Sequence, residues 1–543
     1  MPERPLTRKK ELAAYYTDLR VVDYLVAWGL GVAPGIVMDP SCGDGRFLAA
    51  AARRGARRVI GCDIDARTIE TAAQTLAGAD IPLSLHESDF FRVEPERVGP
   101  VDLIAGNPPF IRYQQFSGES RTRALASALR VGARLTRLSA SWAPFLLHAL
   151  QFLRPGGAMA MVVPAELAQT GYGIATLQAL CGNFARVRLI TFRHNWFEGA
   201  QQETFLLLAE GRGKSCGSAE LVPLERIEQL EGLIAEPEVD DSLRLHPESD
   251  ASLGLAFIDP AARGVWHALT RHPGGFQLRD LGEVANGYVS GANAFFHCRR
   301  VDAVSRGIPL EWLFPVARNS RSLAGLRFGG EDLVVAEDAG TPHHLILPRP
   351  EDLFSAEPEA RRRFIAEGER LDVPRRYKCR VRTPWWRVPG LLAADLLLPY
   401  MIGTAPRSAV NICHALYSNS LHGMRVFPGV APERIALGLL STFSLLSMEL
   451  EGRSYGGGVL KLEPTELQRV RVILPTGSDS ALHQTFDEAD RMLRARDYTG
   501  ATRLADQVIL EGQVGLSHSN LTALRHGRAA LVERRLTRGR SNR

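Results

Sequence analysis

The strongest constraint on the fold of this chain is a strand, a glycine-punctuated loop and a helix start that follow one another within residues 37–52. An apolar run ends at Met38, and Gly43 and Gly45 then punctuate a tight loop. This order places backbone N–H groups and a helix N-terminus against a ligand. The loop lacks the GxxxxGK[ST] pattern of a phosphate-binding loop and carries Asp39 instead. The sequence therefore favours a ligand with a cationic group over a nucleoside triphosphate.

Three further apolar runs predict strands of the same sheet, each followed by a polar residue. In a fold of this kind, an acid at the position of Asp63 hydrogen-bonds ribose hydroxyls. After the third run, Asp89 could accept a hydrogen bond from an adenine amino group while Phe90 packs on the ring. The alternative for both acids is a solvated strand end, but the ordered succession favours a nucleoside site at the edge of a parallel sheet. The three runs are residues 58–63, 83–86 and 101–105.

The fourth strand leads into the tetrapeptide Asn107-Pro108-Pro109-Phe110. A residue before proline is extended, and each proline fixes φ and removes a backbone N–H. The Asn107 side chain and the Pro108 carbonyl are therefore two acceptors that could hold an NH₂ group and localise its lone pair. Phe110 offers a flat face on which a base could stack. An isolated tetrapeptide of this kind is more often a simple turn, so its weight comes from the segments before it.

The order of these motifs resembles the gamma group of adenine-N6 DNA methyltransferases found in prokaryotic restriction–modification systems. The resemblance implies an α/β, Rossmann-like fold that uses S-adenosylmethionine, with a C-terminal α+β DNA-recognition domain. It also implies methyl transfer to N6 of a flipped-out adenine in duplex DNA. Two departures are Asp18, where the family usually has proline, and Phe110, where tyrosine is commoner. The motifs that carry the resemblance are Tyr15-Tyr16-Thr17, DPSCGDGRF at 39–47, Asp63, Asp89-Phe90 and NPPF at 107–110.

The resemblance implies a role for individual residues of this chain. Asp39 would hold the methionine ammonium, Asp63 the ribose and Asp89 the adenine amino group. A second aromatic residue would close on the flipped base, with Phe197 preferred and Trp196 as its rival. The expected cofactor contacts are Tyr16, Thr17, Asp39, Pro40, Cys42, Gly43, Gly45, Asp63, Ile64, Asp89, Phe90 and Asn107. The expected catalytic residues are Asn107, Pro108, Pro109, Phe110 and Phe197.

The sequence predicts four regions. A catalytic domain spans 1–215, a connector 216–250, a target-recognition domain 251–480, and a helical, basic region 481–543. In the recognition domain, arginines and aromatics interleave between residues 375 and 387. This stretch could be a DNA-binding face, or a buried tryptophan pair flanked by surface charge.

Composition agrees with these expectations. With 45% hydrophobic residues the chain can bury full cores, and its net charge of +5 permits nucleic-acid binding. Seven cysteines without CxxC or Cys/His spacing indicate a reducing compartment and no metal site. No apolar run predicts a signal peptide or a membrane span, so we expect a cytoplasmic protein. The expected partner is double-stranded DNA, which a monomer would bind. A cognate restriction endonuclease could be a second partner.

Two other functions remain open at the level of sequence. The NPP(Y/F) tetrapeptide also occurs in methyltransferases that act on RNA or on protein glutamine. The fold could instead serve as a DNA-binding module without turnover. The presence of Asp39, Asp63, Asp89 and Asn107 together favours an active enzyme.

Overall fold

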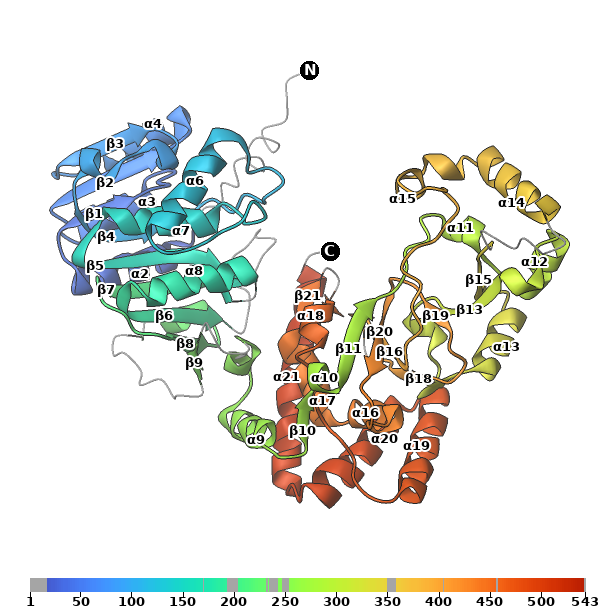
Figure 1. The fold of residues 1–543 in the computed structure, drawn as a ribbon. Coiled ribbons are helices and arrows are strands. Elements are labelled where there is room, and N and C mark those ends of the chain that lie inside the picture. The colour runs from blue at the N-terminus through green and yellow to red at the C-terminus, as the bar shows by residue number, and fades with distance from the viewer. Residues whose placement is uncertain are drawn as a thin grey trace. The chain divides into compact units, whose positions relative to one another are not determined.

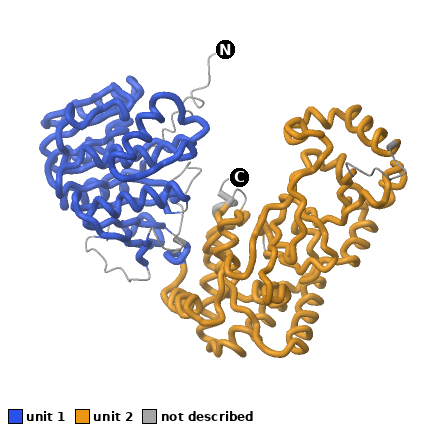
Figure 2. The backbone as a smooth tube through the Cα atoms, viewed as in Figure 1, with its two compact units in different colours: residues 1–257 blue, residues 258–543 orange. Residues whose placement is uncertain are grey.

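The computed structural model describes residues 17–168, 170–192, 204–230, 233, 243–246, 253–348, 358–403, 405–455 and 458–541. The chain divides into two compact units (Figure 2). Unit 1 comprises residues 1–257 and unit 2 comprises residues 258–543. No helix in the described part of the chain combines the length and apolar character needed to cross a membrane.

Unit 1 is organised by one sheet, in which the described residues form nine strands in the order β3-β2-β1-β4-β5-β7-β6-β8-β9 (Figure 1). Strands β3 to β5 pair in parallel, whereas β7 runs antiparallel to both β5 and β6. The strand order reverses between β1 and β4, and doubly wound sheets bind ligands beyond the carboxyl ends of the strands at such a point. The strands are β1 (Ile36–Asp39), β2 (Arg58–Asp63), β3 (Leu83–Glu87), β4 (Val101–Gly106), β5 (Leu153–Pro164), β6 (Phe184–Phe192), β7 (Thr204–Arg212), β8 (Ala219–Leu224) and β9 (Arg244–Leu245).

Both faces of the central strands of this sheet are buried, as in other parallel sheets covered by helices. Leu103 and Ala105 of β4 point into a core cluster that also contains residues of helices α2, α3 and α4. Ile104, between them, points to the opposite face and is equally buried. The expected α/β, Rossmann-like fold with a C-terminal domain is confirmed. The helices are α2 (Leu19–Val32), α3 (Arg46–Arg53), α4 (Ala66–Leu76), α5 (Pro95–Val98), α6 (Gly118–Arg130), α7 (Trp142–Ala149) and α8 (Gly171–Cys181), with short helical turns η1 (Phe90–Arg92), η2 (Leu150–Phe152), η3 (Ala165–Ala168), η4 (Ile227–Leu230) and η6 (Leu253–Phe257).

The stretch predicted as a connector, residues 216–250, contributes two strands to the sheet. Strand β8 pairs in parallel with β6, and β9 pairs with β8. Strand β8 is difficult to recognise in the sequence because the charged residue Glu220 interrupts its apolar pattern. Glu220 is nevertheless buried, since it accepts hydrogen bonds from Arg186 (2.9 Å) and Arg188 (2.8 Å) of β6. The sheet of unit 1 therefore continues past residue 215.

Unit 2 contains several small sheets and a set of helices (Figure 1). Its largest sheet has the order β11-β20-β16-β18-β14, and a second has the order β12-β15-β13-β19. The strands are β10 (Gly275–Gln277), β11 (Gly282–Asn286), β12 (His297–Cys298), β13 (Leu313–Ala317), β14 (Arg327–Phe328), β15 (His344–Ile346), β16 (Leu396–Pro399), β17 (Met401–Ile402), β18 (Ala409–Asn411), β19 (Leu416–Tyr417), β20 (Leu421–Val426), β21 (Arg453–Tyr455), β22 (Val459–Lys461) and β23 (Arg471–Ile473). The helices are α9 (Pro260–Thr270), α10 (Leu278–Leu281), α11 (Asn293–Phe296), α12 (Arg300–Ser305), α13 (Gly330–Asp338), α14 (Pro358–Arg370), α15 (Tyr377–Arg380), α16 (Pro432–Gly438), α17 (Thr442–Glu451), α18 (Pro464–Leu467), α19 (Asp479–Arg494), α20 (Tyr498–Ala505) and α21 (His518–Ser541).

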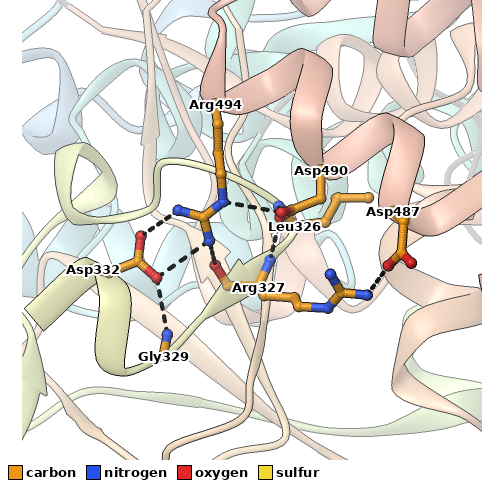
Figure 3. A network of polar contacts seen from close by, with 7 residues as sticks. All are labelled: Leu326, Arg327, Gly329, Asp332, Asp487, Asp490 and Arg494. Carbon is orange, nitrogen blue, oxygen red and sulfur yellow. Dashed lines mark hydrogen bonds and ion pairs between the residues drawn. The ribbon is translucent and has the colours of Figure 1, made fainter.

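A polar network attaches helix α19 to the largest sheet of unit 2 (Figure 3). Asp490 of α19 accepts hydrogen bonds from the backbone N–H groups of Leu326 (2.7 Å) and Arg327 (3.1 Å). Arg494, one turn further on, forms ion pairs with Asp490 (2.9 Å) and with Asp332 of α13 (3.0 Å). Asp490 and Asp332 are both buried. The C-terminal helices are thus fixed to the sheet through satisfied buried charges.

We expect Asp490→Ala to lower the free energy of unfolding by about 2–3 kcal/mol, because it leaves two backbone donors without their acceptor and removes one of the two carboxylates that pair with Arg494. Urea denaturation of the full chain measures this loss. Asp487→Ala is the matched control on the same helix, since Asp487 is 55% exposed and pairs only with the Arg327 side chain among the contacts in Figure 3. The control should cost less than about 1 kcal/mol. Equal losses for the two variants would show that the buried network does not hold α19 in place.

Candidate functional site

A cavity of about 250 Å³ lies at the point where the strand order of unit 1 reverses. Its walls come from the loops that follow β1, β2, β3 and β4, so the residues predicted at the strand ends meet in one place. Of the predicted site residues, the cavity is lined by Thr17, Asp39, Pro40, Cys42, Gly43, Asp63, Ile64, Asp89, Phe90, Asn107 and Pro109.

Three predicted residues do not line this cavity. Gly45 is the N-cap of α3 with a φ of 81°, and a Cβ there would lie 3.0 Å from Ala72, which explains the need for glycine. Pro108 is buried, and Phe110 is partly buried and packs against the core cluster of unit 1. The predicted residues Tyr16, Phe197 and Trp196 lie outside the described residues.

Asp39, the last residue of β1, is a buried acid in the cavity wall. Its side chain is 1% exposed, and its Oδ1 accepts a hydrogen bond from the backbone N–H of Ser41 (3.0 Å). The backbone of Gly106 lies so close that a Cβ there would be 2.5 Å from Oδ1. Burial raises the pKa of the Asp39 carboxyl to about 8, and the charge of Asp63 acts in the same direction. A cationic ligand group in the cavity would favour the ionised form.

Asp63 and Asp89 shape the loops around the cavity. Asp63 Oδ2 accepts a hydrogen bond from the backbone N–H of Gly43 (2.9 Å), which ties the loop after β1 to the end of β2. Asp89 caps the short turn η1 by accepting from the N–H of Phe91 (3.1 Å). Phe90 is buried in an aromatic cluster, with its ring 4.8 Å from that of Phe145. Phe90 therefore forms a fixed apolar wall of the cavity.

Asn107 presents an unsatisfied acceptor. Its Nδ2 donates to Thr17 Oγ1 (3.2 Å), and its backbone carbonyl accepts from Ser41 Oγ (3.0 Å). These contacts orient the side-chain amide. Its Oδ1 is buried and has no hydrogen-bond partner among the described residues. A buried acceptor without a donor costs about 1–3 kcal/mol, so the site is prepared for a donor that arrives with a ligand.

Sequence reasoning missed two residues that hold the site in place. Ser141 donates to the carbonyl of Pro109 and accepts from the N–H of Ile111 (2.9 Å), which clamps the turn after Asn107. Its sequence position before a helix indicates only an N-cap. Arg46 donates to the backbone carbonyl of Thr17 and pairs with Asp44 (2.6 Å). No local pattern links Ser141 to the site, whereas Arg46 lies within the motif at 39–47 and the resemblance implies no role for it.

Asp18, which departs from the resembled family, has a structural role. It is the N-cap of α2, and its side chain accepts a hydrogen bond from the N–H of Arg20 (2.8 Å). An aspartate is among the preferred residues at this position. The departure therefore starts the helix that follows Thr17.

Among the residues that the structure describes, no group of three or more His, Cys, Asp or Glu side chains is arranged to hold a metal ion.

In unit 2, the stretch 375–387 divides into buried and exposed aromatic residues. Trp386 is buried, and the ring of Trp385 lies 5.8 Å from that of Phe295, so the tryptophan pair belongs to a core cluster. Of the two alternatives for this stretch, the tryptophan pair itself follows the second, a packed pair flanked by surface charge. Tyr377 is instead 66% exposed, and the Lys378 ammonium lies 5.5 Å from its ring centroid.

Comparison with known protein families gives one match in each unit. Residues 37–133 match a methyltransferase domain, and this range contains β1 to β4 and most of the cavity wall. Residues 254–510 match the C-terminal domain of type II methyltransferase M.Eco57I. This second match lies almost entirely in unit 2.

One relative matches across both units, and another matches about a third of the chain. The chain is 22% identical over 479 residues to type II methyltransferase M.XamI of Xanthomonas campestris pv. amaranthicola, covering 86% of each chain. It is 28% identical over 221 residues to type II methyltransferase M.BanIII of Aneurinibacillus aneurinilyticus, covering 35% of this chain and 36% of that protein. Among solved structures, the type IIG restriction endonuclease BpuSI aligns with a TM-score of 0.45 at 15% identity, covering 97% of this chain and 67% of that chain. The chain is therefore similar to type II methyltransferases in both sequence comparisons.

Proposed function

We propose that this chain is a site-specific DNA methyltransferase that transfers the methyl group of S-adenosylmethionine to N6 of a flipped-out adenine. The observation that carries the proposal is the buried Asn107 Oδ1, which is oriented by Thr17 and lacks a donor among the described residues. The names of the relatives M.XamI and M.BanIII support a methyltransferase of the type II class.

The cavity of unit 1 fits the groups of S-adenosylmethionine. Asp39 would meet the methionine ammonium, because a buried carboxyl with a raised pKa gains from a cation at close range. Asp63 would accept from the ribose hydroxyls and Asp89 from the adenine amino group, with the Phe90 wall against the ring. When bound, the cofactor supplies a methyl group that a sulfonium makes electrophilic.

The residues of the Asn107 turn would prepare the target nitrogen. Asn107 Oδ1 and the Pro108 carbonyl accept the two hydrogens of the adenine amino group, which localises a lone pair that the purine would otherwise share. The clamp from Ser141 to Pro109 and Ile111 keeps the turn rigid. Because these acceptors are fixed before the substrate arrives, they stabilise developing charge without reorganisation.

The target adenine must leave the duplex to reach these acceptors. Flipping a base costs a few kcal/mol, and stacking on an aromatic ring returns about 1–3 kcal/mol per base. Phe110 is the stacking ring of this proposal, and it requires a modest movement from its packed position against the core. Phe197, or Trp196 in its place, would close on the other face.

Unit 2 would read the DNA sequence. Its exposed Tyr377 is flanked by Lys378 and by the Arg380 guanidinium, 5.8 Å from the ring, and Arg375 is 85% exposed. Aromatic rings interleaved with cations suit contacts to bases and phosphates. The proposed division is catalysis by 1–215, target recognition by 251–480 and support by the basic helices of 481–543. We also propose a cytoplasmic monomer on DNA that works beside a cognate restriction endonuclease.

Mass spectrometry of nucleosides tests this function directly. The purified chain is incubated with labelled S-adenosylmethionine and mixed-sequence duplex DNA, which is then digested. The label should be found in N6-methyladenine. Label in a methylated cytosine would refute the adenine assignment, and label in protein or RNA offered in parallel, with none in DNA, would refute the DNA substrate.

Binding of S-adenosylmethionine should release a proton from Asp39. Burial raises the pKa of the Asp39 carboxyl to about 8, so this carboxyl is mostly protonated at pH 7 before the cofactor binds. The ammonium group of the bound cofactor would favour the ionised carboxylate. We expect release of about one proton per cofactor between pH 6 and pH 7, with affinity that rises as pH rises towards 8. Calorimetry in two buffers of different ionisation enthalpy measures this release. Asp39→Asn should bind more weakly and release none, and proton-neutral binding by the wild type would remove Asp39 from the ammonium role.

A further inference from the structure

A second cavity lies in unit 2 among helices α17, α19, α20 and α21, which Figure 1 shows together at the C-terminal end of the chain. Its volume is about 430 Å³. One side of the cavity is apolar, and the other is lined by hydroxyl groups and guanidinium groups. The polar residues used below are Tyr498, Thr499, Thr502, Arg503, Arg525 and Arg528.

One of the three arginines is already neutralised. Arg525 pairs with Asp506, whose Oδ2 accepts from the Arg525 Nη2 (2.9 Å). Asp506 is fully buried and also accepts from the N–H (2.7 Å) and the hydroxyl (2.8 Å) of Thr442. Both oxygens of Asp506 therefore have hydrogen-bond partners, and Asp506 contacts neither Arg503 nor Arg528 directly.

Arg528 has no direct ion-pair partner among the described residues, although the charges of Glu449 and Asp506 act on it. Its Nε is buried without a hydrogen-bond partner, and no described residue forms an ion pair with its guanidinium. Burial lowers the pKa of Arg528, which expresses the cost of keeping this charge away from water. The nearby acid Glu449 is engaged with Arg535 (2.9 Å). An arginine in this state gains most from an anion that enters the cavity.

Two further features of the cavity suit an oxyanion. Arg503 is exposed at the cavity and forms no ion pair with a described residue. The Tyr498 hydroxyl accepts a hydrogen bond from Arg407 Nη2 (2.7 Å), so its own hydrogen remains available to donate. The hydroxyl groups of Thr499 and Thr502 add donors on the same wall.

We propose that this cavity is a binding site for a phosphate-class oxyanion, held by Arg528 and Arg503 with Tyr498, Thr499 and Thr502 as hydroxyl donors. A planar guanidinium matches the geometry of phosphate oxygens and binds them through paired N–H groups. The phosphate could belong to a small free anion or to the backbone of bound DNA, and the chemistry of recognition is the same for both. The site lies in unit 2, whereas the methyl-transfer site lies in unit 1.

Thermal unfolding of the full chain in sodium phosphate, compared with sodium chloride at equal ionic strength, tests the site. At a phosphate concentration about tenfold above its Kd, the wild-type Tm should rise by about 2–4 °C. Arg528→Gln should lose this rise without a lower Tm in chloride, because it removes a buried charge that has no partner. Arg503→Gln, at an exposed position, should reduce the affinity for phosphate several-fold with an unchanged Tm in chloride.

Arg491→Gln is the matched control, since Arg491 is exposed on α19 and does not line the cavity. Its response to phosphate should equal that of the wild type. The proposal is overturned if phosphate does not raise the wild-type Tm, or if Arg528→Gln and Arg503→Gln both retain the full rise.

The source of the phosphate is found by measuring the affinity of the same variants for a fluorescent DNA duplex over a range of salt concentrations. A logarithmic salt slope that falls by about one in Arg528→Gln indicates a DNA phosphate in the cavity. An unchanged slope, together with the lost response to inorganic phosphate, indicates a free anion. Both results support the cavity as an oxyanion site.

Discussion

Asn107→Ala is expected to lower the rate of methyl transfer by at least about 10²–10³-fold while the affinity for S-adenosylmethionine changes little. The variant removes the buried Oδ1 that has no donor among the described residues and that we assign to the adenine amino group. It leaves Asp39, Asp63 and Asp89 in place around the cofactor cavity. Single-turnover methylation of duplex DNA measures the rate, and calorimetry measures cofactor affinity.

Two companion variants separate chemistry from positioning. Thr17→Val removes the hydroxyl that accepts from Asn107 Nδ2 but keeps the Oδ1 acceptor, so its rate should fall less than that of Asn107→Ala. Asp23→Asn, on the surface of α2 and outside the cavity, should behave as the wild type. An Asn107→Ala enzyme that retains a rate within about tenfold of the wild type would contradict the role of the paired acceptors.

Removal of unit 2 by ending the chain at residue 257 is expected to abolish site-specific methylation and to preserve cofactor binding. Unit 1 has its own core cluster. Unit 1 also contains every residue that lines the cavity at its strand ends. The exposed arginines and Tyr377 that we assign to DNA contact belong to unit 2. Methylation of a plasmid library measures specificity, and calorimetry measures cofactor binding by the truncated protein.

A full-length variant tests the same assignment without the removal of unit 2. Tyr377→Ala combined with Arg380→Ala removes the exposed ring and one of its cations. It should weaken DNA binding and leave cofactor affinity unchanged, since neither residue lines the cavity of unit 1. Sequence-specific methylation by the truncated protein would show that recognition does not require unit 2.

The convergence of residues around the cavity of unit 1 could be predicted from sequence because of how parallel sheets are built. The carboxyl ends of parallel strands meet at one edge, so acids at successive strand ends, such as Asp39, Asp63 and Asp89, must converge. The glycine loop and the proline-fixed turn at Asn107 act over a few residues, and short-range constraints of that kind are legible in a single sequence.

Features that depend on contacts between distant segments could not be predicted. Ser141 clamps the Asn107 turn across a long sequence separation, with no pattern of its own. Strand β8 could not be recognised because its buried charge, Glu220, is satisfied by arginines of two other strands, β6 and β9. The charged residues interleaved with Trp385 and Trp386 indicate an exposed segment, whereas both rings pack in a core cluster. In each case the position of the residue depends on contacts with a segment far along the chain.

Sequencing of modified bases in a host that lacks its own adenine methylation tests the central claim most directly. The host carries either the wild-type chain or Asn107→Ala, expressed at equal levels. The account predicts N6-methyladenine at one defined sequence motif with the wild type and at no motif with the variant. Host DNA that remains unmethylated by the wild-type chain, or that carries the same adenine methylation with both chains, would contradict it.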